Sequence, residues 1–491
     1  MRKLLEKENK YNKNNEIIIL GGGPAGMACA IELANSNRKF ILLEKENKVG
    51  GLAKTLIFKK GKNFFRTDIG PHRFFSKNKY LYQLIEKLLG KDWILVNRKT
   101  RQYINKKFYD YPIKLGQSLK NMGFLKALSI GFSYLNAIIK YKFLGKEIKN
   151  FEDYIISKFG IKLGEFNILN YTEKIWGISC NKLHPDWAKQ RIKGLNIFSA
   201  LKDAIFKKKN NVPKTLLDSF YYPKYGAGFL YEVMAEESKK KGNKIKTRSF
   251  PTEICHKNNK IIRIDAKIDG KNNIFYPEKI VSSIPVGNFL NLLNPPPPLN
   301  IINASKSLKW RSQVYLFIII NKKKVFEDNW IYFPNKEIPF GRMSEMKNFS
   351  KEMSPFDKTS LLVEFFVTEG DDIWGKTKKE LFDLAMNSLQ KEGFLDKKDV
   401  EDYYTWREKY VYPVYDMDYY KNRIKIIDYL DKFENLNYIG RPGRFKYNNQ
   451  DHSLEMGLLA AKNIVDNKGY DIEKVGSEEE YFEKGLIKDG K

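Results

Sequence analysis

The sequence predicts an α/β fold with three parts: a Rossmann-like nucleotide-binding domain, an inserted helical domain, and a substrate domain with a mixed or antiparallel sheet. Three patterns support this fold class. An apolar strand, a glycine-rich turn and an apolar helix follow one another near the N-terminus, apolar residues recur at helical spacing from 115 to 194, and apolar β-type runs are frequent after residue 310. The length of 491 residues predicts two or three domains.

The glycine-rich turn is the best-defined motif. Gly21, Gly23 and Gly26 form the pattern G-x-G-x-x-G between the predicted strand at residues 17–20 and the predicted helix at residues 27–34. We assign the first glycine to the tight turn, the second to the approach of backbone amides to a pyrophosphate, and the third to close packing of the helix on the strand. The N-terminus of this helix would then hold the negative charge of the pyrophosphate.

A carboxylate follows at the end of the next predicted strand, residues 39–43. Glu44 can accept hydrogen bonds from both hydroxyls of an adenosine ribose. The turn and this acid leave FAD and NAD open, and the pair Gly50 and Gly51 favours FAD. The residues that we assign to the cofactor in this part of the chain are Gly21, Gly23, Pro24, Ala25, Gly26, Glu44, Lys45, Gly51 and Leu52.

The formal net charge of +30 raises the question of a polyanionic partner. The lysines are scattered, which argues against nucleic acid and favours an anionic small substrate or a loose attraction to an anionic membrane surface. Cys29, Cys180 and Cys255 lie far apart and predict neither a disulfide framework nor a metal site. The polar N-terminus and the lack of a run of about 20 apolar residues predict a cytoplasmic protein without a transmembrane segment.

The next elements extend the nucleotide-binding domain. Residues 54–65 predict a hairpin, and Gly70 and Pro71 predict a turn that leaves His72 on a loop beside the nucleotide site. A lone histidine is usually structural, but its place in a cofactor domain makes a flavin contact an equal alternative. Residues 80–89 predict an amphipathic helix, and residues 101–111 predict a pair of strands.

The remaining elements form the helical insert and the substrate domain. Within the helical region, residues 171–177 are interpreted as packing elements. Residues 279–284 predict a strand that returns to the nucleotide-binding domain, and the NPPPP run at 294–298 marks the crossing into another region. The later elements are strands at 313–321, 330–333 and 360–368, a helix at 378–391, a last strand at 437–440, a loop at 441–453 and a closing helix at 454–465.

These elements predict a nucleotide-binding domain assembled from separate segments of the chain. The expected boundaries are 1–100 and 207–290 for the first two FAD-binding segments, 101–206 for the inserted helical domain with flanking strands, 291–435 for the sheet of the substrate domain, 436–475 for the C-terminal FAD-binding segment, and 476–491 for a charged tail.

Arg342 and Arg441 differ from the scattered lysines because each lies at a predicted junction of strand and loop. The planar guanidinium group can bond two phosphate oxygens at once, so a pair of arginines suits a diphosphate. Each arginine alone is more simply explained as the cover of a sheet edge. At such junctions side chains reach into a cleft, where both arginines could act together.

Several motifs together carry a resemblance to a known family. They are GGGPAG at 21–26 with Glu44, GPHRFFS at 70–76, WIYFP at 330–334, PFGR at 339–342 and GRPGRFKYNNQDHS at 440–453. With them the chain resembles UDP-galactopyranose mutase, and the eukaryotic-type branch is closer than the bacterial one. This family overlaps the wider group of FAD-dependent amine oxidases and protoporphyrinogen oxidases, which shares the N-terminal unit.

The resemblance implies a role for each motif residue. Arg342 and Arg441 would hold the diphosphate of a nucleotide sugar as catalytic residues, and His72 would lie against the flavin as the third. The implied substrate-binding residues are Tyr111, Trp330, Tyr332, Tyr412, Tyr447 and Asn449, and the implied flavin contacts near the C-terminus are Gln450, Asp451 and Ser453. The resemblance implies no metal ligand.

The resemblance also implies the reaction. In the family, N5 of reduced FAD attacks the anomeric carbon of the UDP-sugar, the nucleoside diphosphate leaves, and the sugar ring opens and recloses between its pyranose and furanose forms. The product would serve as a precursor of cell-surface polysaccharide, and NAD(P)H is a candidate reductant. The alternative is an FAD-dependent oxidoreductase of the amine oxidase or protoporphyrinogen oxidase type.

Two departures from the family pattern concern the substrate. Ile113 and Lys114 follow Tyr111 and Pro112, where the family has an aromatic residue and a glutamine that grip uracil. Phe445 stands where the family tends to have tryptophan. The resemblance therefore names neither the base nor the sugar.

Overall fold

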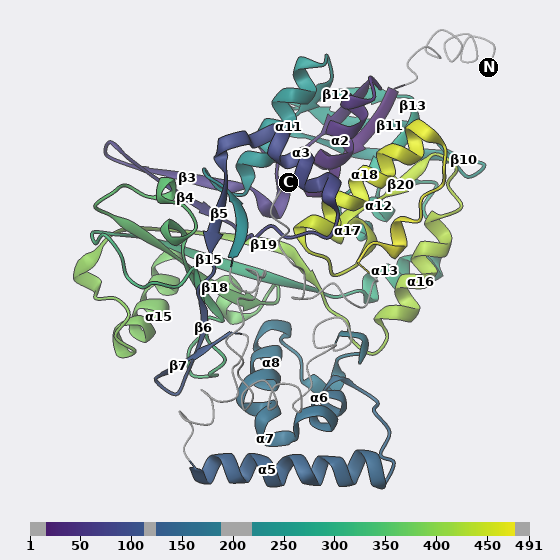
Figure 1. Ribbon diagram of the computed structural model, residues 1–491. Helices are drawn as coiled ribbons and strands as arrows, with labels where there is room; N and C mark the ends of the chain where they lie inside the picture. Colours follow the sequence, from purple (N-terminus) through teal and green to yellow (C-terminus); the bar gives the residue numbers. More distant parts are fainter. Residues whose placement is uncertain (1–15, 112–123, 188–218, 477–491) are drawn as a thin grey trace, which may run out of the picture.

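The computed structural model describes residues 16–111, 124–187 and 219–476 and confirms the predicted fold class (Figure 1). Its Rossmann-like core is a parallel sheet with the strand order β20-β13-β1-β2-β9. The strands predicted at 279–284 and 437–440 return to this sheet, as expected: β13 pairs with β1, and β20 pairs with β13. The bounds are Glu16–Leu20 for β1, Phe40–Leu43 for β2, Lys244–Lys246 for β9, Pro277–Ser282 for β13 and Leu436–Tyr438 for β20.

Two helices approach the first turn of this sheet closely. They are α2 (Pro24–Asn35), which follows the turn, and α18 (Gln450–Asp466), which packs along α2. A Cβ atom on Gly26 would lie 2.0 Å from the carbonyl oxygen of Gly21, and one on Gly457 would lie 2.1 Å from that of Ala25. Both distances are below any van der Waals contact, so this packing requires glycine at each position.

Smaller sheets and helices surround the core. The two-stranded ribbons are β3 with β4, the predicted hairpin, and β5 with β8. A further sheet has the order β12-β11-β10-β14. The bounds are Thr55–Lys60 for β3, Asn63–Asp68 for β4, Trp93–Asn97 for β5, Ser219–Pro223 for β8, Ser249–Lys257 for β10, Lys260–Ile268 for β11, Lys271–Phe275 for β12, Leu293–Asn294 for β14, Lys79–Leu89 for α3 and Gly228–Lys240 for α11.

The substrate-domain sheet has the order β19-β15-β18-β17-β16-β6-β7, and α15 (Lys378–Lys391) packs on it, as predicted. All its pairs are antiparallel except that of β16 with β6, so the sheet is mixed. The hairpin of β6 and β7 therefore continues this sheet from far away in the sequence. The bounds are Thr100–Ile104 for β6, Lys107–Asp110 for β7, Trp310–Ile320 for β15, Trp330–Tyr332 for β16, Arg342–Glu345 for β17, Thr359–Val367 for β18 and Val400–Pro413 for β19.

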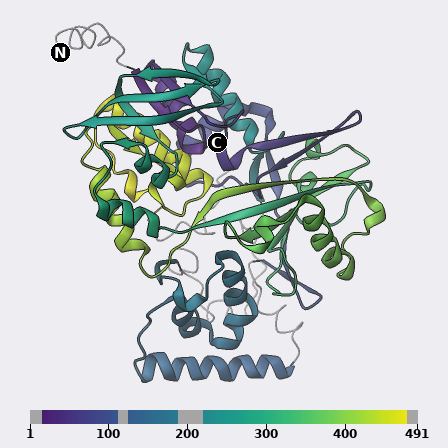
Figure 2. The same cartoon turned by 180° about the vertical axis from the view of Figure 1, so that it is seen from behind.

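The helical insert forms the lower end of the molecule in Figure 1, and the view from behind in Figure 2 places it at the same end. It contains α5 (Phe124–Ile138), α6 (Phe151–Phe159), α7 (Ile161–Leu163) and α8 (Asn170–Trp176). Helix α8 lies nearest the other domains, and α5 lies farthest from them. The predicted division of the chain into domains stays a prediction.

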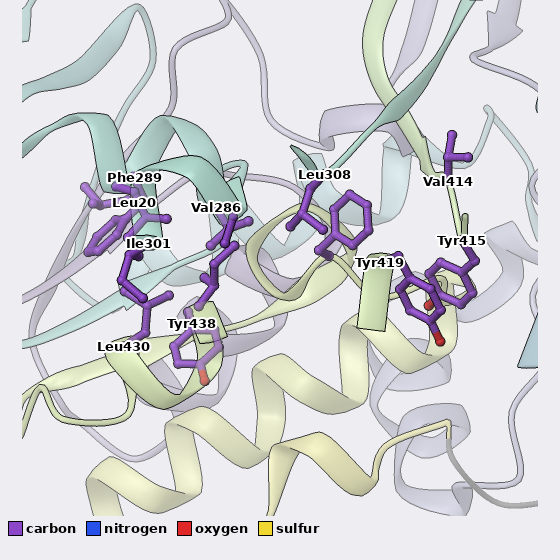
Figure 3. Close-up of a cluster of buried hydrophobic side chains, with 14 of the residues drawn as sticks. Leu20, Val286, Phe289, Ile301, Leu308, Val414, Tyr415, Tyr419, Leu430 and Tyr438 are labelled. Atoms are coloured by element: carbon purple, nitrogen blue, oxygen red, sulfur yellow. The ribbon is translucent and has the colours of Figure 1, made fainter. Parts of the chain in front are cut away.

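A hydrophobic cluster joins the parallel sheet to the later helices, as Figure 3 shows. Leu20 of β1 lies in it with Phe289 of α12 (Val286–Asn291), Ile301 of α13 (Leu299–Ser307) and Leu430 of α16 (Tyr419–Leu430). The same cluster includes Trp176 of α8. The helical insert thus shares buried apolar surface with the core, which holds it in place.

The segment from 441 to 453, predicted as a loop, is partly helical. Residues Gly440–Arg444 form the short helix α17, and α18 begins at Gln450 rather than at residue 454. Arg444 holds α17 in place, because its side chain donates to Glu473 Oε2 and to the backbone oxygen of Tyr438. Glu473 lies 29 residues along the chain from Arg444, too far for a local pattern to show this contact.

The part of the chain that the structure describes contains no helix long and apolar enough to cross a membrane. Within the same residues no group of three or more histidine, cysteine, aspartate or glutamate side chains could hold a metal ion. Cys29, Cys180 and Cys255 are free thiols.

We expect the substitution Gly457→Ala to lower the free energy of unfolding by about 2 kcal/mol, because its methyl group would overlap the backbone of α2. Chemical denaturation followed by circular dichroism measures this change. Gly131→Ala is the matched control, since Gly131 also lies in a helix but its added Cβ would meet no atom within 4 Å. Equal stabilities of the two variants would contradict the close packing of α18 on α2.

Candidate functional site

The glycine turn opens the candidate cofactor site. Gly23 is the N-cap of α2 and has no side chain to cap the helix, so no N-cap side chain bonds the amides of Ala25 and Gly26. The backbone of Gly51 crosses beside this turn, where a Cβ on Gly51 would lie 3.0 Å from Gly23 Cα. Backbone amides at a helix N-terminus that no side chain caps suit the pyrophosphate of a dinucleotide.

Glu44 lies beside the same turn at the end of β2. Its carboxylate accepts hydrogen bonds from the amides of Gly22 (2.6 Å) and Glu46 (2.8 Å). Burial raises the pKa of Glu44, and the two amide bonds partly offset this rise. Of the neighbouring predicted contacts, Leu52 is half-buried and Lys45 is exposed. The glycines, the helix N-terminus and this carboxylate form a donor and acceptor set that fits the adenosine diphosphate part of FAD.

His72 lies where two cationic side chains converge. Burial lowers the pKa of His72 to about 3, and the charges of Arg441 and Arg342 add to this effect. His72 is therefore neutral in the folded protein. Its Nδ1 atom is enclosed and makes no hydrogen bond within the described residues. An unsatisfied ring nitrogen on the loop after Gly70 is consistent with the predicted flavin contact, which remains a prediction.

Arg342 forms a buried bidentate ion pair with Glu364. Its Nε donates to Oε1 and its Nη2 to Oε2, each at 2.6 Å. Burial lowers the pKa of Arg342, but the charge and hydrogen bonds of Glu364, together with Tyr412 and Tyr171, raise it to a net increase, so the guanidinium stays charged. The two residues face each other across β17 and β18. Gly70 closes over the pair, since its added Cβ would lie 3.1 Å from Nη2 of Arg342.

The ion pair leaves part of Arg342 available. Two of its three nitrogens bond Glu364, the side chain keeps 14% of its surface exposed, and Nη1 has no partner within the described residues. Gln313 adds a further bond to the carboxylate, with its Nε2 donating to Glu364 Oε2 at 3.2 Å. Glu364 itself is fully buried. The carboxylate therefore positions Arg342 and neutralises most of its charge.

Arg441 has no carboxylate partner in the described part of the chain and lies against two tyrosine rings. Its Nε and Nη2 donate to the backbone oxygen of Asn448, and its Nη1 donates to that of Val411 at 2.7 Å. The guanidinium carbon lies 5.0 Å from the ring centre of Tyr412 and 5.2 Å from that of Tyr447. Arg441 therefore keeps its net positive charge and two further N–H groups.

Burial raises the pKa of Tyr412, against the opposing charge of Arg342 and, more weakly, of Arg441. Its phenol is therefore protonated and can donate a hydrogen bond. The Tyr412 and Tyr447 rings stack with centres 5.7 Å apart. Because Arg342 and Arg441 both act on His72 and on Tyr412, the two arginines belong to one cluster.

Tyr332 extends this cluster from β16, where it faces Arg342 across the strands. Its ring packs edge-on against those of Tyr111 (5.1 Å) and Tyr171 (5.2 Å). Trp330 is buried on the same strand. The sequence predicts packing for Tyr171, and in the structure its ring contacts that of Tyr332, which places it at the site. Burial raises the pKa of its phenol, against the opposing charge of Arg342.

Lys174, one helical turn after Tyr171 on α8, fastens the helical insert to the loop between β16 and β17. Its ammonium group donates to the backbone oxygens of residues 333, 335, 338 and 340 at 2.5 to 3.2 Å. That loop connects Tyr332 to Arg342. The insert and the substrate sheet are thus held together directly beside the cluster.

The predicted residues at the start of α18 directly follow Asn448, whose backbone oxygen accepts hydrogen bonds from Arg441. Asn449 is the N-cap of α18 and Asp451 is buried in its first turn. Ser453 donates to Asn448 Oδ1 at 3.1 Å, and Gln450 donates to the hydroxyl of Tyr231. These residues shape the backbone that carries Arg441, and their contacts with a cofactor remain a prediction.

The structure therefore brings together most of the predicted substrate residues: His72, Arg342, Arg441, Tyr111, Tyr332, Tyr412 and Tyr447. The glycine turn and Glu44 lie at a separate place on the nucleotide-binding sheet. Sequence reasoning missed Glu364 and Tyr171. Ile113 and Lys114, which depart from the family pattern, lie outside the described residues.

Comparison with known proteins agrees with the fold described above. The sequence pattern of the family described as flavin containing amine oxidoreductase matches residues 24–415. Zeta-carotene desaturase of Capsicum annuum is 28% identical over 101 residues, which are 21% of this chain and 17% of that protein. L-amino-acid oxidase of Mus musculus is 29% identical over 125 residues, 23% of this chain and 19% of that protein. The chain thus matches less than a fifth of the length of these relatives.

Solved structures match over almost the whole chain. A reduced UDP-galactopyranose mutase superposes with a TM-score of 0.79 at 17% identity and covers 95% of this chain and 97% of its own. A putative protoporphyrinogen oxidase from Exiguobacterium sp. 255-15 gives 0.68 at 15% identity, covering 93% and 98%. A putrescine oxidase bound to putrescine gives 0.62 at 14% identity, covering 92% and 99%. At these identities the likeness concerns the fold.

The lowered pKa of His72 predicts a pH-dependent stability. As the pH falls, the unfolded chain takes up the proton first, near its ordinary pKa of about 6.5, so the folded state loses stability below that pH. From about pH 7 to pH 5 the loss due to His72 should be about 2 kcal/mol. Chemical denaturation at both pH values, compared between the wild type and His72→Gln, isolates this contribution.

The control for this experiment is His256→Gln, because His256 lies on β10, in another sheet, with its Nε2 2.8 Å from the backbone oxygen of Pro295. An equal change of stability with pH in the wild type and in His72→Gln would show that the pKa of His72 is not lowered in the folded protein.

Proposed function

We propose that this chain, which belongs to the flavin containing amine oxidoreductase family, is an FAD-dependent nucleotide-sugar mutase that interconverts pyranose and furanose rings. The observation that carries this proposal is the cluster of Arg342, Arg441 and Tyr412 around His72. It combines fixed cationic donors with a protonated phenol. Such a set of donors suits a diphosphate. It is unusual for the mostly apolar site that is expected of an amine oxidase.

In this proposal Arg441 is the principal diphosphate ligand. Its net charge is not neutralised by a carboxylate within the described residues, and the two tyrosine rings and two carbonyl groups hold its plane in one orientation. Departure of the nucleoside diphosphate increases negative charge on the phosphate oxygens. A guanidinium that is already oriented meets this charge without reorganisation.

Arg342 and the tyrosines complete the diphosphate site. Arg342 offers Nη1 and is held in place by Glu364, so it supplies a directed hydrogen bond with less net charge. The hydroxyls of Tyr412, Tyr447 and Tyr332 would donate to phosphate or sugar oxygens, in line with the expected roles. Tyr171 stands beside Tyr332 and narrows the same space.

FAD, when bound along the glycine turn, would supply in its reduced form the nucleophile for the anomeric carbon. The reaction is an isomerisation, so substrate and product have the same atoms and electrons. The protein is then required to orient the diphosphate, to stabilise its charge while it is detached, and to keep water away from the sugar. His72, which is neutral and therefore adds no positive charge beside the arginines, would contact the flavin.

A second candidate function is an FAD-dependent oxidoreductase of the amine oxidase type. The family match and the sequence relatives favour it, since both are named for oxidation reactions. In such an enzyme the Arg342 and Glu364 pair would be purely structural and Arg441 would have no anion to bind. Net consumption of oxygen with an amine or a porphyrinogen distinguishes this function from ring interconversion.

The deciding experiment is anaerobic. Protein with chemically reduced FAD is incubated with UDP-galactopyranose or UDP-galactofuranose, and the sugar nucleotides are separated by chromatography. Interconversion without net consumption of reductant is the expected result. Failure to interconvert either sugar, or other nucleoside diphosphate sugars, by protein that carries reduced FAD would refute the proposal.

We expect Arg441→Lys to lower the rate of ring interconversion about 100-fold or more, because a lysine cannot reproduce the directed donors toward a leaving diphosphate. Flavin absorbance should be unchanged. Arg407→Lys is the matched control: Arg407 lies on β19, the strand that carries Tyr412, but it bonds the backbone oxygens of Trp374 and Lys376 outside the cluster. Loss of FAD from Arg441→Lys would assign Arg441 to the cofactor instead.

A further inference from the structure

The outer face of α5 is a continuous apolar surface. Side chains that recur every three or four residues are exposed along the helix and its π-helical extension Ile139–Phe143. Phe132 is 70% exposed and Phe143 is 79% exposed. We call this surface the α5 stripe; it consists of Leu125, Leu128, Phe132, Leu135, Ile139, Phe143 and Leu144.

The α5 stripe lies at an extremity of the molecule. Figures 1 and 2 both place α5 along the end of the helical insert, with α6, α7 and α8 on one side of it only. The opposite side of α5 carries Ile130 and Tyr134, which pack on the core cluster, and the buried Ala137. No described residue covers the α5 stripe. An apolar surface of this size on a soluble domain marks a site of interaction.

Positive charge surrounds the stripe. Residues 124–149 contain five lysines and one glutamate, with no arginine or aspartate. Lys140 and Lys142 are exposed at its C-terminal end, and Lys162 donates to the hydroxyl of Ser129 on α5. Beside the stripe, an open groove is lined by Ser129, Lys140 and Lys162 among apolar side chains. These hydroxyl and ammonium donors suit phosphate groups next to apolar chains.

We propose that the α5 stripe docks the protein on an anionic lipid bilayer, with α5 lying in the plane of the interface. The stripe would enter the boundary of headgroups and acyl chains while Lys140, Lys142 and Lys162 contact lipid phosphates. A basic helix with one apolar face has the composition of such an interfacial helix. The described part of α5 has 15 residues, fewer than the about 20 of a spanning helix.

Charge also distinguishes the bilayer from a second copy of this chain. A symmetric pair of copies joined through α5 would bring the lysines of both copies close together. An anionic surface neutralises these charges, and the net charge of +30 would add a general attraction toward it. This docking is independent of the function proposed for the flavin site.

The test is flotation of the full-length protein with two kinds of vesicle, phosphatidylcholine alone and phosphatidylcholine mixed with phosphatidylglycerol. We expect binding to the mixed vesicles, weakened by salt, and little binding to the neutral ones. The double variant F132N/L135N should bind at least about 10-fold more weakly. Lys140→Gln and Lys142→Gln should each weaken binding about 5-fold.

The matched control is Phe356→Asn, because Phe356 is also 79% exposed but lies outside the α5 stripe. It should bind like the wild type. Circular dichroism and flavin absorbance establish that each variant is folded. Absence of binding to the mixed vesicles would overturn the proposal, as would equal binding by F132N/L135N and Phe356→Asn. A dimer in sedimentation that only F132N/L135N disrupts, without vesicle binding, would assign the stripe to a contact between copies.

Discussion

The arrangement of the candidate site depends on the buried ion pair between Glu364 and Arg342. Glu364 lies within the central strand β18 with no exposed side-chain surface, so its charge has to be neutralised where it lies. Arg342 does this from the adjacent strand, and the Gly70 loop of the nucleotide-binding domain closes over both side chains. The pair thus fixes the position of Arg342. Because His72 lies on the loop that closes over the pair, the pair also limits where His72 can lie. Replacing Glu364 alone would leave a buried cation unpaired.

Because of this pair, the two arginines are not equivalent. Arg342 is neutralised by a carboxylate, whereas Arg441 is held only by carbonyl oxygens and aromatic faces. The excess positive charge of the cluster therefore resides on Arg441. The lowered pKa of His72 agrees with this assignment, since Arg441 acts on it more strongly than Arg342 does. An entering anion would be attracted mainly by Arg441, while Arg342 would determine its orientation.

The sequence was sufficient where the determinants are local. The glycine turn, the strand before it and the helix after it follow from one short segment, and the two returning strands follow from their apolar runs. The partner of Arg342 was also visible in principle, because Glu364 is the one charged residue in the run SLLVEFFV. Tyr171 had no such signal. Its place at the site depends on how the helical insert docks through Lys174, which no local pattern encodes.

The helical insert has two faces with different physical tasks. On the side of the site, α8 contributes Tyr171 and the lysine that fastens the loop before Arg342. On the far side, α5 packs on the core through Ile130 and Tyr134, and Lys162 donates to Ser129 and Ser133 on its flank, whereas the side chains of the α5 stripe stay exposed. The stripe therefore adds little to the stability of the fold, and its exposure in water is unfavourable. A surface that covers it would stabilise the protein without approaching the flavin site, since α5 lies farthest from the other domains.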